Sequence, residues 1–205
     1  EKFDLIFFSN LKISEQDNYS DFFKKSSSQW HDVYDLEDEF LTKKIRKLKI
    51  DILIDLNGFF EGNRFQILVD RCAKFQIAWL GYNNSLGTNN IDFIIADPNL
   101  FKNGEDHLYS ERILLFNNIW NSMSLPENLP NIEENKNQNI FSYGSFNNYV
   151  KMSNETIEVW SKIINYSNSR LYLKSSMVIT QDIKNNILKK FFVNGVKKNQ
   201  IVFLD

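Results

Sequence analysis

The feature that most constrains this sequence is a short, continuous run of β-branched residues and leucine that ends in a turn. The run Asp51–Gly58 (DILIDLNG) follows the segment Glu37–Leu48 (EDEFLTKKIRKL), which is acidic in its first turn and basic in its last. That charge polarity is the one a helix macrodipole favours. A helix followed at once by an apolar strand is typical of a parallel sheet, where each crossover passes through a helix. The sequence therefore predicts a central parallel strand at Asp51–Leu56.

The same alternation of apolar runs and helical segments extends over the first half of the chain. Residues Phe3–Ser9 (FDLIFFS) form an aromatic-rich run that predicts a strand buried on both faces. The other expected strands are Trp30–Leu36, Phe75–Leu80 and Ile91–Ala96, and the other expected helices are Tyr19–Ser28 and Arg64–Arg71. Strands separated by helices pair in parallel through right-handed crossovers, the doubly wound arrangement. Functional side chains are then expected at the carboxyl ends of the strands.

A polar stretch divides the chain into two parts. Residues Ser122–Gln138 hold two of the three prolines, many charged residues and little hydrophobic periodicity, as in a connection between lobes. Beyond it, strands are expected at Ile140–Tyr143, Arg170–Lys174 and Gln200–Leu204, helices at Asn154–Tyr166 and Gln181–Phe192, and a loop at Gly144–Met152. The sequence predicts a first Rossmann-like lobe over residues 1–121, a linker over 122–138 and the opening half of a nucleotide-binding lobe over 139–205.

Both lobes are expected to be incomplete. The chain opens on Glu1 without a methionine, and it ends on Asp205 directly after an expected strand. A doubly wound lobe needs more strands than the second part supplies to bury its sheet. The predicted fold class is therefore α/β, with two doubly wound, Rossmann-like lobes of which this chain holds a part.

Composition argues against several classes of protein. Hydrophobic residues make up 42% and charged residues 24% of the 205 residues, which gives enough apolar surface for a packed core. The net charge of -2 offers no basic excess for a nucleic acid or an anionic membrane surface. The single cysteine, Cys72, cannot form an intramolecular disulfide, and no run reaches the roughly 20 apolar residues of a membrane span. We expect a cytoplasmic protein that binds neither nucleic acid nor membrane.

General catalytic motifs do not occur in the sequence. There is no GxGxxG, Walker A, HExxH or GxSxG pattern and no paired-cysteine zinc spacing. His31 lies in an expected strand and His107 in a loop, neither beside other metal-ligating residues. We interpret both histidines as structural or surface residues and Cys72 as a small core residue. We expect no metal site and no cofactor.

Two loops at the expected carboxyl ends of strands carry the best candidates for a binding site. Loop Asn57–Arg64 (NGFFEGNR) holds two glycines, which either let the backbone approach a ligand or simply form a tight turn. Loop Gly144–Lys151 (GSFNNYVK) leads into a helix with Ser153 as its expected cap. Backbone amides at a helix start and the Lys151 ammonium favour an anion such as a phosphate, although a lysine in this position is also commonly just solvated.

Six sequence blocks resemble one known family. They are DILIDLNG (51–58), EGNR (61–64), QIAWLGY (76–82), YSERILLF (109–116), YGSFNNYVK (143–151) and SRLYLK (169–174). In this order and spacing the chain resembles the catalytic region of the O-linked N-acetylglucosamine transferases, with their plant SPINDLY-type and bacterial relatives. The resemblance implies the GT-B architecture, in which two Rossmann-like lobes face each other and hold the nucleotide sugar between them.

The resemblance also implies an activity and a site. Members of the family transfer N-acetylglucosamine from UDP-N-acetylglucosamine to serine or threonine hydroxyls of an acceptor protein without a metal, and tetratricopeptide repeats usually precede their catalytic lobes. By this likeness Lys151 is the catalytic residue that contacts the donor diphosphate, and Asn148 lies against the nucleotide sugar. A fixed ammonium suits a UDP leaving group, which gains negative charge as the sugar bond breaks. The residues expected to line the cleft are Asn57, Gly58, Phe59, Gly81 and Tyr82.

Some residues depart from the family pattern and leave alternatives open. Phe59 and Phe60 stand where many bacterial relatives have His and Thr, and Asn83–Ser85 replace a Pro-Gly-Thr segment. The alternatives are a related transferase that uses another nucleotide sugar, and a non-catalytic protein-binding module with the same fold. The part of the protein that this chain represents is expected to be inactive alone.

Overall fold

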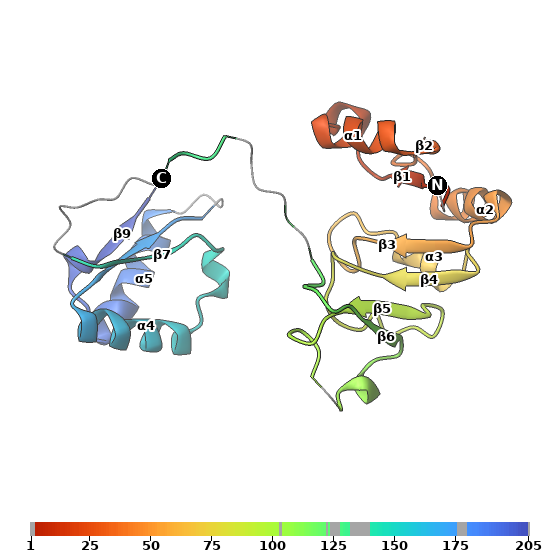
Figure 1. Ribbon diagram of the computed structural model, residues 1–205. Helices are drawn as coiled ribbons and strands as arrows, with labels where there is room; N and C mark the ends of the chain where they lie inside the picture. The colour runs from red at the N-terminus through yellow and green to blue at the C-terminus, as the bar shows by residue number, and fades with distance from the viewer. Residues whose placement is uncertain are drawn as a thin grey trace. The chain divides into compact units, whose positions relative to one another are not determined.

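The computed structural model describes residues 3–102, 104–121, 123, 128–131, 140–175 and 180–204, and the chain divides into two compact units (Figure 1). The first unit is Glu1–Glu127 and the second is Asn128–Asp205. This division falls inside the stretch 122–138. Most of that stretch lies outside the described residues, so the linker and the lobe boundaries at residues 121 and 139 stay predictions.

The first unit contains two parallel sheets. A two-stranded sheet is followed along the chain by a four-stranded sheet whose strands pair in sequence order. The strands are β1 (Ile6–Ser9), β2 (Gln29–Asp32), β3 (Ile52–Asp55), β4 (Phe75–Ala78), β5 (Phe93–Ala96) and β6 (Arg112–Leu115), and the helices are α1 (Asn18–Ser26), α2 (Asp38–Leu48) and α3 (Phe65–Val69), with 3₁₀ turns η1 (Ile13–Glu15) and η2 (Asp106–Leu108). Figure 1 shows β3 to β6 side by side. Because each pairing is parallel, the carboxyl ends of these strands gather at one edge.

Local sequence explains where the helices of this unit begin and end. Asp17 accepts hydrogen bonds from the amides of Tyr19 and Ser20, both at 3.0 Å, and so satisfies two donors that the first turn of α1 leaves without partners. Helix α2 has the predicted acidic first turn and basic last turn. It ends at Lys49, whose left-handed backbone (φ 54°) stops the helix.

Helices α2 and α3 pack against one face of the four-stranded sheet. Leu41 and Ile45 of α2 and Ile67 of α3 are buried in one cluster with Ala78 of β4 and Ile94 of β5. Burying one such aliphatic side chain contributes about 1.5–3 kcal/mol relative to leaving it exposed. This cluster fixes the position of the loops that leave β3 and β4, because those strands share the same core.

Two expectations about the strands of the first unit are wrong. Strand β1 begins only at Ile6, and Phe3 and Leu5 are exposed, so the segment is not a strand buried on both faces. Strand β3 is the first strand of its sheet rather than a central one, and Ile52 and Ile54 point to an exposed face. An apolar run indicates a strand, but it does not show which neighbours cover it.

The sequence analysis also missed β6 and misplaced one strand end. No helical pattern precedes β6, so the alternation rule did not indicate a strand at Arg112–Leu115 although its four residues include three aliphatic ones. Strand β2 ends at Asp32, and the expected residues up to Leu36 form a turn in which the Leu36 amide donates to the Val33 carbonyl at 3.0 Å. The remaining elements of this unit lie within a few residues of their expected positions.

The second unit is a three-stranded parallel sheet with two long helices. Its elements are β7 (Ser142–Ser145), η3 (Tyr149–Lys151), α4 (Asn154–Ser167), β8 (Arg170–Leu173), α5 (Gln181–Val193), η4 (Lys198–Gln200) and β9 (Ile201–Phe203), and the strand order is β7-β8-β9. Gly144 and Ser145, expected in a loop, belong to β7 because they pair with Tyr172 and Leu173. Across the described residues of both units, no helix has the length and apolarity needed to span a membrane.

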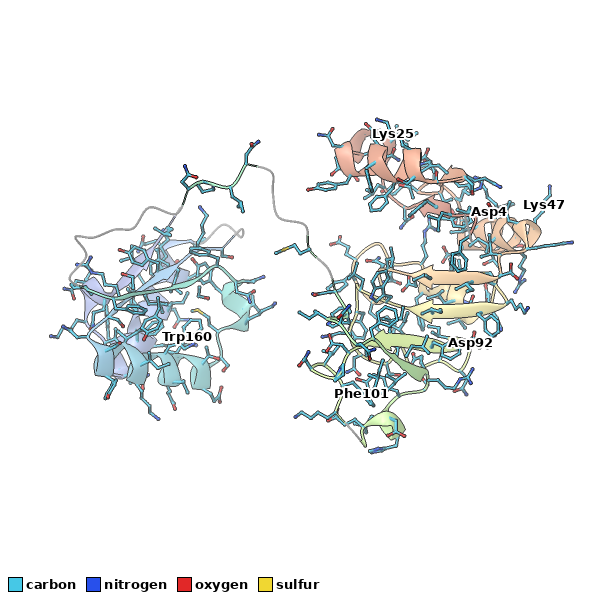
Figure 2. The ribbon with its side chains drawn as sticks, viewed as in Figure 1. Asp4, Lys25, Lys47, Asp92, Phe101 and Trp160 are labelled. Carbon is cyan, nitrogen blue, oxygen red and sulfur yellow. The ribbon has the colours of Figure 1, made fainter. Side chains whose placement is uncertain are left out.

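One hydrophobic cluster holds the second unit together. Ile157 and Ile164 of α4 and Phe191 of α5 are buried with Leu171 and Leu173 of β8. The ring of Trp160, labelled in Figure 2, packs against this cluster from α4. Both helices therefore cover the same core, and that core supports the loop between β7 and α4.

We predict that Phe191→Ala lowers the free energy of unfolding of the second unit by about 3–5 kcal/mol, because it leaves a cavity where a fully buried ring stood. Val193→Ala on the same helix is the matched control, since Val193 is 80% exposed and its loss is expected to cost no more than about 0.5 kcal/mol. Urea denaturation followed by circular dichroism measures both. Equal losses in the two variants would contradict the assignment of the core.

Candidate functional site

Tight packing joins the loops that leave β3 and β4. Gly58 has φ +61°, and a Cβ atom built on it would lie 2.2 Å from Cβ of Tyr82. A Cβ atom on Gly81 would lie 2.2 Å from the carbonyl oxygen of Leu56. Both positions therefore require glycine, and the space beside each glycine is filled by the chain itself.

The turn that carries Gly58 is held by a carboxylate. Oδ2 of Asp55 accepts a hydrogen bond from the Gly58 amide at 2.7 Å. Burial raises the pKa of Asp55 above its usual value, against the effect of the backbone amides that donate to it. The carboxylate thus fixes the direction in which the chain leaves β3.

The structure brings together the five residues expected to line a cleft in the first unit. Asn57, Gly58 and Phe59 leave β3 beside Gly81 and Tyr82, which leave β4. The Phe59 ring lies 5.2 Å from the Tyr82 ring, between centroids, and 46% of its surface is exposed. These residues form an aromatic and amide surface at the carboxyl edge of the sheet.

Arg64 follows this loop and is the residue of the site whose role the sequence analysis missed. Its guanidinium donates five hydrogen bonds: Nε to Oδ1 of Asn10 (2.9 Å), Nη1 to the Leu36 carbonyl (2.8 Å) and to Oδ1 of Asp38 (2.7 Å), and Nη2 to the carbonyls of Val33 (2.8 Å) and Tyr34 (2.9 Å). The side chain is 21% exposed. The EGNR block drew attention to this position but did not indicate its partners.

A cavity of about 280 Å³ lies beside the Arg64 partners, at the carboxyl ends of β1 and β2. Its walls are two short segments, Leu11–Ser14 after β1 and Tyr34–Leu36 after β2, together with Asp32. Oδ1 of Asp32 accepts hydrogen bonds from the Trp30 indole at 2.9 Å and from the Gln16 amide at 2.6 Å. These bonds lower the pKa of Asp32, so its carboxylate stays ionised over the physiological pH range. Lys12 also lines the cavity, and its ammonium lies 3.8 Å from the Glu15 carboxylate.

In the second unit the predicted anion site lies on the turn η3 and at the start of α4. Oδ1 of Asn148 accepts from the Val150 amide at 3.0 Å and thereby caps η3. Oγ of Ser153 accepts from the Thr156 amide at 3.2 Å, which confirms Ser153 as the cap of α4. Both oxygens are engaged with the backbone, so the Asn148 NH₂ group keeps its donors for another partner.

Lys151 ends the turn η3 and is exposed. Its backbone amide donates to the Asn148 carbonyl at 3.0 Å, so the two predicted site residues share one turn. Among the residues that the structure describes, the Lys151 ammonium has no hydrogen bond or ion pair. The turn therefore presents one amide and one ammonium.

Tyr149 anchors this turn to the rest of the second unit. Its ring packs edge-on against Phe203 of β9 at 6.2 Å between centroids, and it contacts the hydrophobic cluster. Burial raises the pKa of the Tyr149 hydroxyl. Because the tyrosine is turned into the core, the neighbouring Asn148 and Lys151 have a fixed support.

The histidines and the cysteine have structural positions. His31 stacks on Phe8 at 5.3 Å between centroids, and Nδ1 of His107 lies 2.7 Å from the Gly104 carbonyl. Burial raises the pKa of the Cys72 thiol to about 11, which keeps it protonated and unreactive. Within the described ranges, no three His, Cys, Asp or Glu side chains are grouped closely enough to hold a metal ion.

Comparison with known proteins places this geometry in a family. The sequence profile of glycosyl transferase family 41 matches residues 4–121, more than half of the chain. The chain belongs to this family. The resemblance to the O-linked N-acetylglucosamine transferases is thereby confirmed.

Individual family 41 relatives match most of this chain and a small part of their own length. The probable UDP-N-acetylglucosamine-peptide N-acetylglucosaminyltransferase SPINDLY of Solanum lycopersicum is 27% identical over 207 residues, which cover 98% of this chain and 22% of the relative. The SPINDLY protein of Petunia hybrida is 31% identical over 156 residues, 73% of this chain and 16% of the relative. The chain spans about a fifth of the length of these curated relatives.

A solved family member has the same fold. A point mutant of the Thermobaculum terrenum O-GlcNAc transferase matches with a TM-score of 0.88 at 26% identity, over 98% of this chain and 38% of that protein. The predicted fold class, α/β of the GT-B type with parallel sheets, is confirmed by this neighbour. The roles of the individual site residues stay predictions.

We predict that Gly58→Ala destabilises the first unit more than Gly62→Ala does. Both glycines have positive φ, which costs a non-glycine residue about 1–2 kcal/mol. Only Gly58 also meets a neighbour, Tyr82, and overpacking adds about 1–3 kcal/mol. Melting temperatures of the two variants measure the difference, and equal shifts would contradict the close packing of Gly58 on Tyr82.

Proposed function

We propose that the full-length protein transfers N-acetylglucosamine from UDP-N-acetylglucosamine to serine or threonine hydroxyls of an acceptor protein. Membership of glycosyl transferase family 41 and the names of the matching relatives support this activity. The single observation that carries the proposal is the turn Asn148–Lys151, which presents, directly before the capped helix α4, an amide and an ammonium that has no partner among the described residues.

The proposed chemistry needs positive charge where the UDP group leaves. As the bond between the sugar and the diphosphate breaks, the diphosphate gains negative charge, and an ammonium beside it stabilises the departing diphosphate more than the bound substrate. Lys151 supplies that ammonium in this proposal, without a metal ion. Helix α4, with 14 residues, adds the favourable field of its amino end.

Asn148 would act beside Lys151 on the nucleotide sugar. Its side-chain oxygen is fixed by the Val150 amide, so the orientation of its NH₂ group is set before a ligand binds. A donor whose orientation is already fixed loses less conformational entropy on binding than a freely rotating one. We assign Asn148 to donor binding and Lys151 to both donor binding and leaving-group stabilisation.

The first unit would then hold the acceptor. Its carboxyl edge carries Asn57, Phe59 and Tyr82, and the neighbouring cavity carries the ionised Asp32. Aromatic rings and amides suit a polypeptide, whereas a carboxylate repels a diphosphate. A related transferase with another nucleotide sugar, and a protein-binding module without catalysis, are the other outcomes that a donor experiment distinguishes.

We predict that Lys151→Ala in the full-length protein weakens UDP binding by about ten- to hundredfold, because a charged hydrogen bond contributes about 1.5–3 kcal/mol. Turnover should fall by a larger factor, since the leaving-group charge grows in the transition state. Isothermal titration with UDP measures binding, and radiolabelled transfer from UDP-N-acetylglucosamine measures turnover.

The matched control for this prediction is Lys162→Ala, which removes an exposed ammonium from the middle of α4. Melting temperatures should stay close to wild type in both variants, because neither lysine is part of the core. Equal UDP affinity in wild type and Lys151→Ala would contradict the proposed role of Lys151. Absence of UDP binding in the wild-type protein would favour the protein-binding module.

A further inference from the structure

Arg64 joins two segments that leave different strands of the first unit. One is the segment Val33–Asp38, which runs from the end of β2 to the first residue of α2, and the other is the loop Asn57–Asn63, between β3 and α3. Arg64 lies at the end of the loop, and four of its five hydrogen bonds go to the segment Val33–Asp38. One side chain thus sets the distance between the loop at the carboxyl end of β2 and the loop at the carboxyl end of β3.

The fifth hydrogen bond of Arg64 extends the hydrogen-bond network to Asn10. The Arg64 Nε group donates to Oδ1 of Asn10, and Nδ2 of Asn10 donates to the Gly62 carbonyl at 2.6 Å. Asn10 directly follows β1, so this hydrogen-bond network connects the ends of β1, β2 and β3. Each end of the Asn10 amide is used, which leaves the asparagine a single orientation.

The guanidinium of Arg64 has no donor left for a substrate. An arginine side chain carries five N–H bonds in a rigid planar fork, and all of them are used here at 2.7 to 2.9 Å. Arg64 is therefore not a ligand of a diphosphate or a carboxylate. Arg64 can therefore affect a bound molecule only through the conformation of the loops that it holds.

The loops held by Arg64 also shape the cavity at the ends of β1 and β2. Tyr34 and Leu36, whose carbonyls accept from the guanidinium, form one wall of the cavity, and Leu11, which follows Asn10, belongs to the other. Loss of the guanidinium would release both walls. Phe59 lies in the Asn57–Asn63 loop, which the Asn10 side chain joins to Arg64 through the Gly62 carbonyl.

We propose that Arg64 is a positioning residue for the acceptor polypeptide: it holds the cavity wall and the Phe59 loop in the one arrangement that places an acceptor. The proposal rests on the function proposed above. Two carboxylates, Asp32 and Asp35, and one ammonium, Lys12, line this cavity, and Lys12 already lies 3.8 Å from the Glu15 carboxylate. The remaining negative charge makes the cavity unfavourable for a UDP diphosphate, so the donor is expected to bind independently of Arg64.

Arg71 provides a matched control for the test. Its guanidinium donates to the carbonyls of Asn90 (3.1 Å) and Lys74 (2.9 Å) and to the Asp92 carboxylate (2.9 Å). Lys74 and Asp92 directly precede β4 and β5, so Arg71 ties loops at the amino edge of the four-stranded sheet, where Figure 2 labels Asp92. Arg64→Lys and Arg71→Lys therefore each remove a guanidinium that donates to backbone carbonyls and to a carboxylate. Arg64 does this at the carboxyl ends of strands and Arg71 at the amino ends.

The experiment compares wild type, Arg64→Lys and Arg71→Lys in the full-length protein. The probes are UDP for titration, and UDP-N-acetylglucosamine with a synthetic library of short peptides, each with one serine or threonine, for transfer. We expect Arg64→Lys to raise the KM for peptide by about ten- to hundredfold, since a small misplacement of reacting groups has effects of this size. UDP affinity should stay at the wild-type value in both variants, and Arg71→Lys should lower the melting temperature without changing the peptide KM.

A second variant, Asn10→Ala, tests the same inference if Arg64→Lys does not fold. Asn10→Ala removes the connection to Gly62 and leaves four hydrogen bonds of Arg64 in place. It should raise the peptide KM in the same direction by a smaller factor.

The outcomes separate this inference from the proposed function. An unchanged peptide KM in Arg64→Lys, or equal increases in Arg64→Lys and Arg71→Lys, would overturn the positioning role while the transferase activity stands. Failure of the wild-type protein to bind UDP and to transfer sugar would overturn the proposed function itself, and the acceptor role of Arg64 with it.

Discussion

Parallel strand pairing is the constraint on which the rest of the structure depends. Each pairing among the described strands is parallel, so each strand returns through a connection that starts at the carboxyl edge of its sheet. The candidate residues of the first unit lie in such connections after β1, β2, β3 and β4, and those of the second unit follow β7. The edge on which the candidate residues lie is therefore a consequence of how the sheet is built.

Polar side chains with complete sets of partners hold these connections in place. Arg64 does so after β2 and β3, and Asp97 does so after β5, where its carboxylate accepts from the amides of Asn99 at 2.7 Å and Trp120 at 2.6 Å. The Trp120 amide is the main reason that the pKa of Asp97 is lowered. Polar groups with such sets of partners specify one loop conformation, because any other would leave a donor or a carboxylate without a partner.

Local patterns in the sequence were sufficient to predict most of the helices and strands. The polarity of α2 and the Ser153 cap depend on residues a few positions apart, which periodicity and capping rules detect, whereas Asn148 was expected only from the resemblance to the family. The edge position of β3 and the role of Arg64 depend on distant partners, since the acceptors of Arg64 lie between 26 and 54 residues away in the chain. No local rule connects such positions, so the hydrogen-bond network around Arg64 is seen only in the folded chain.

The proposal places a donor site in the second unit and an acceptor site in the first. Hydrogen exchange of the full-length protein, measured by mass spectrometry, tests it most directly. We expect saturating UDP to slow exchange in residues 144–156, around the Asn148–Lys151 turn and the start of α4. Residues 33–38 and 57–64 should be slowed only after an acceptor peptide is added. Protection of residues 57–64 by UDP alone, with no change in residues 144–156, would contradict a donor site in the second unit and an acceptor site in the first.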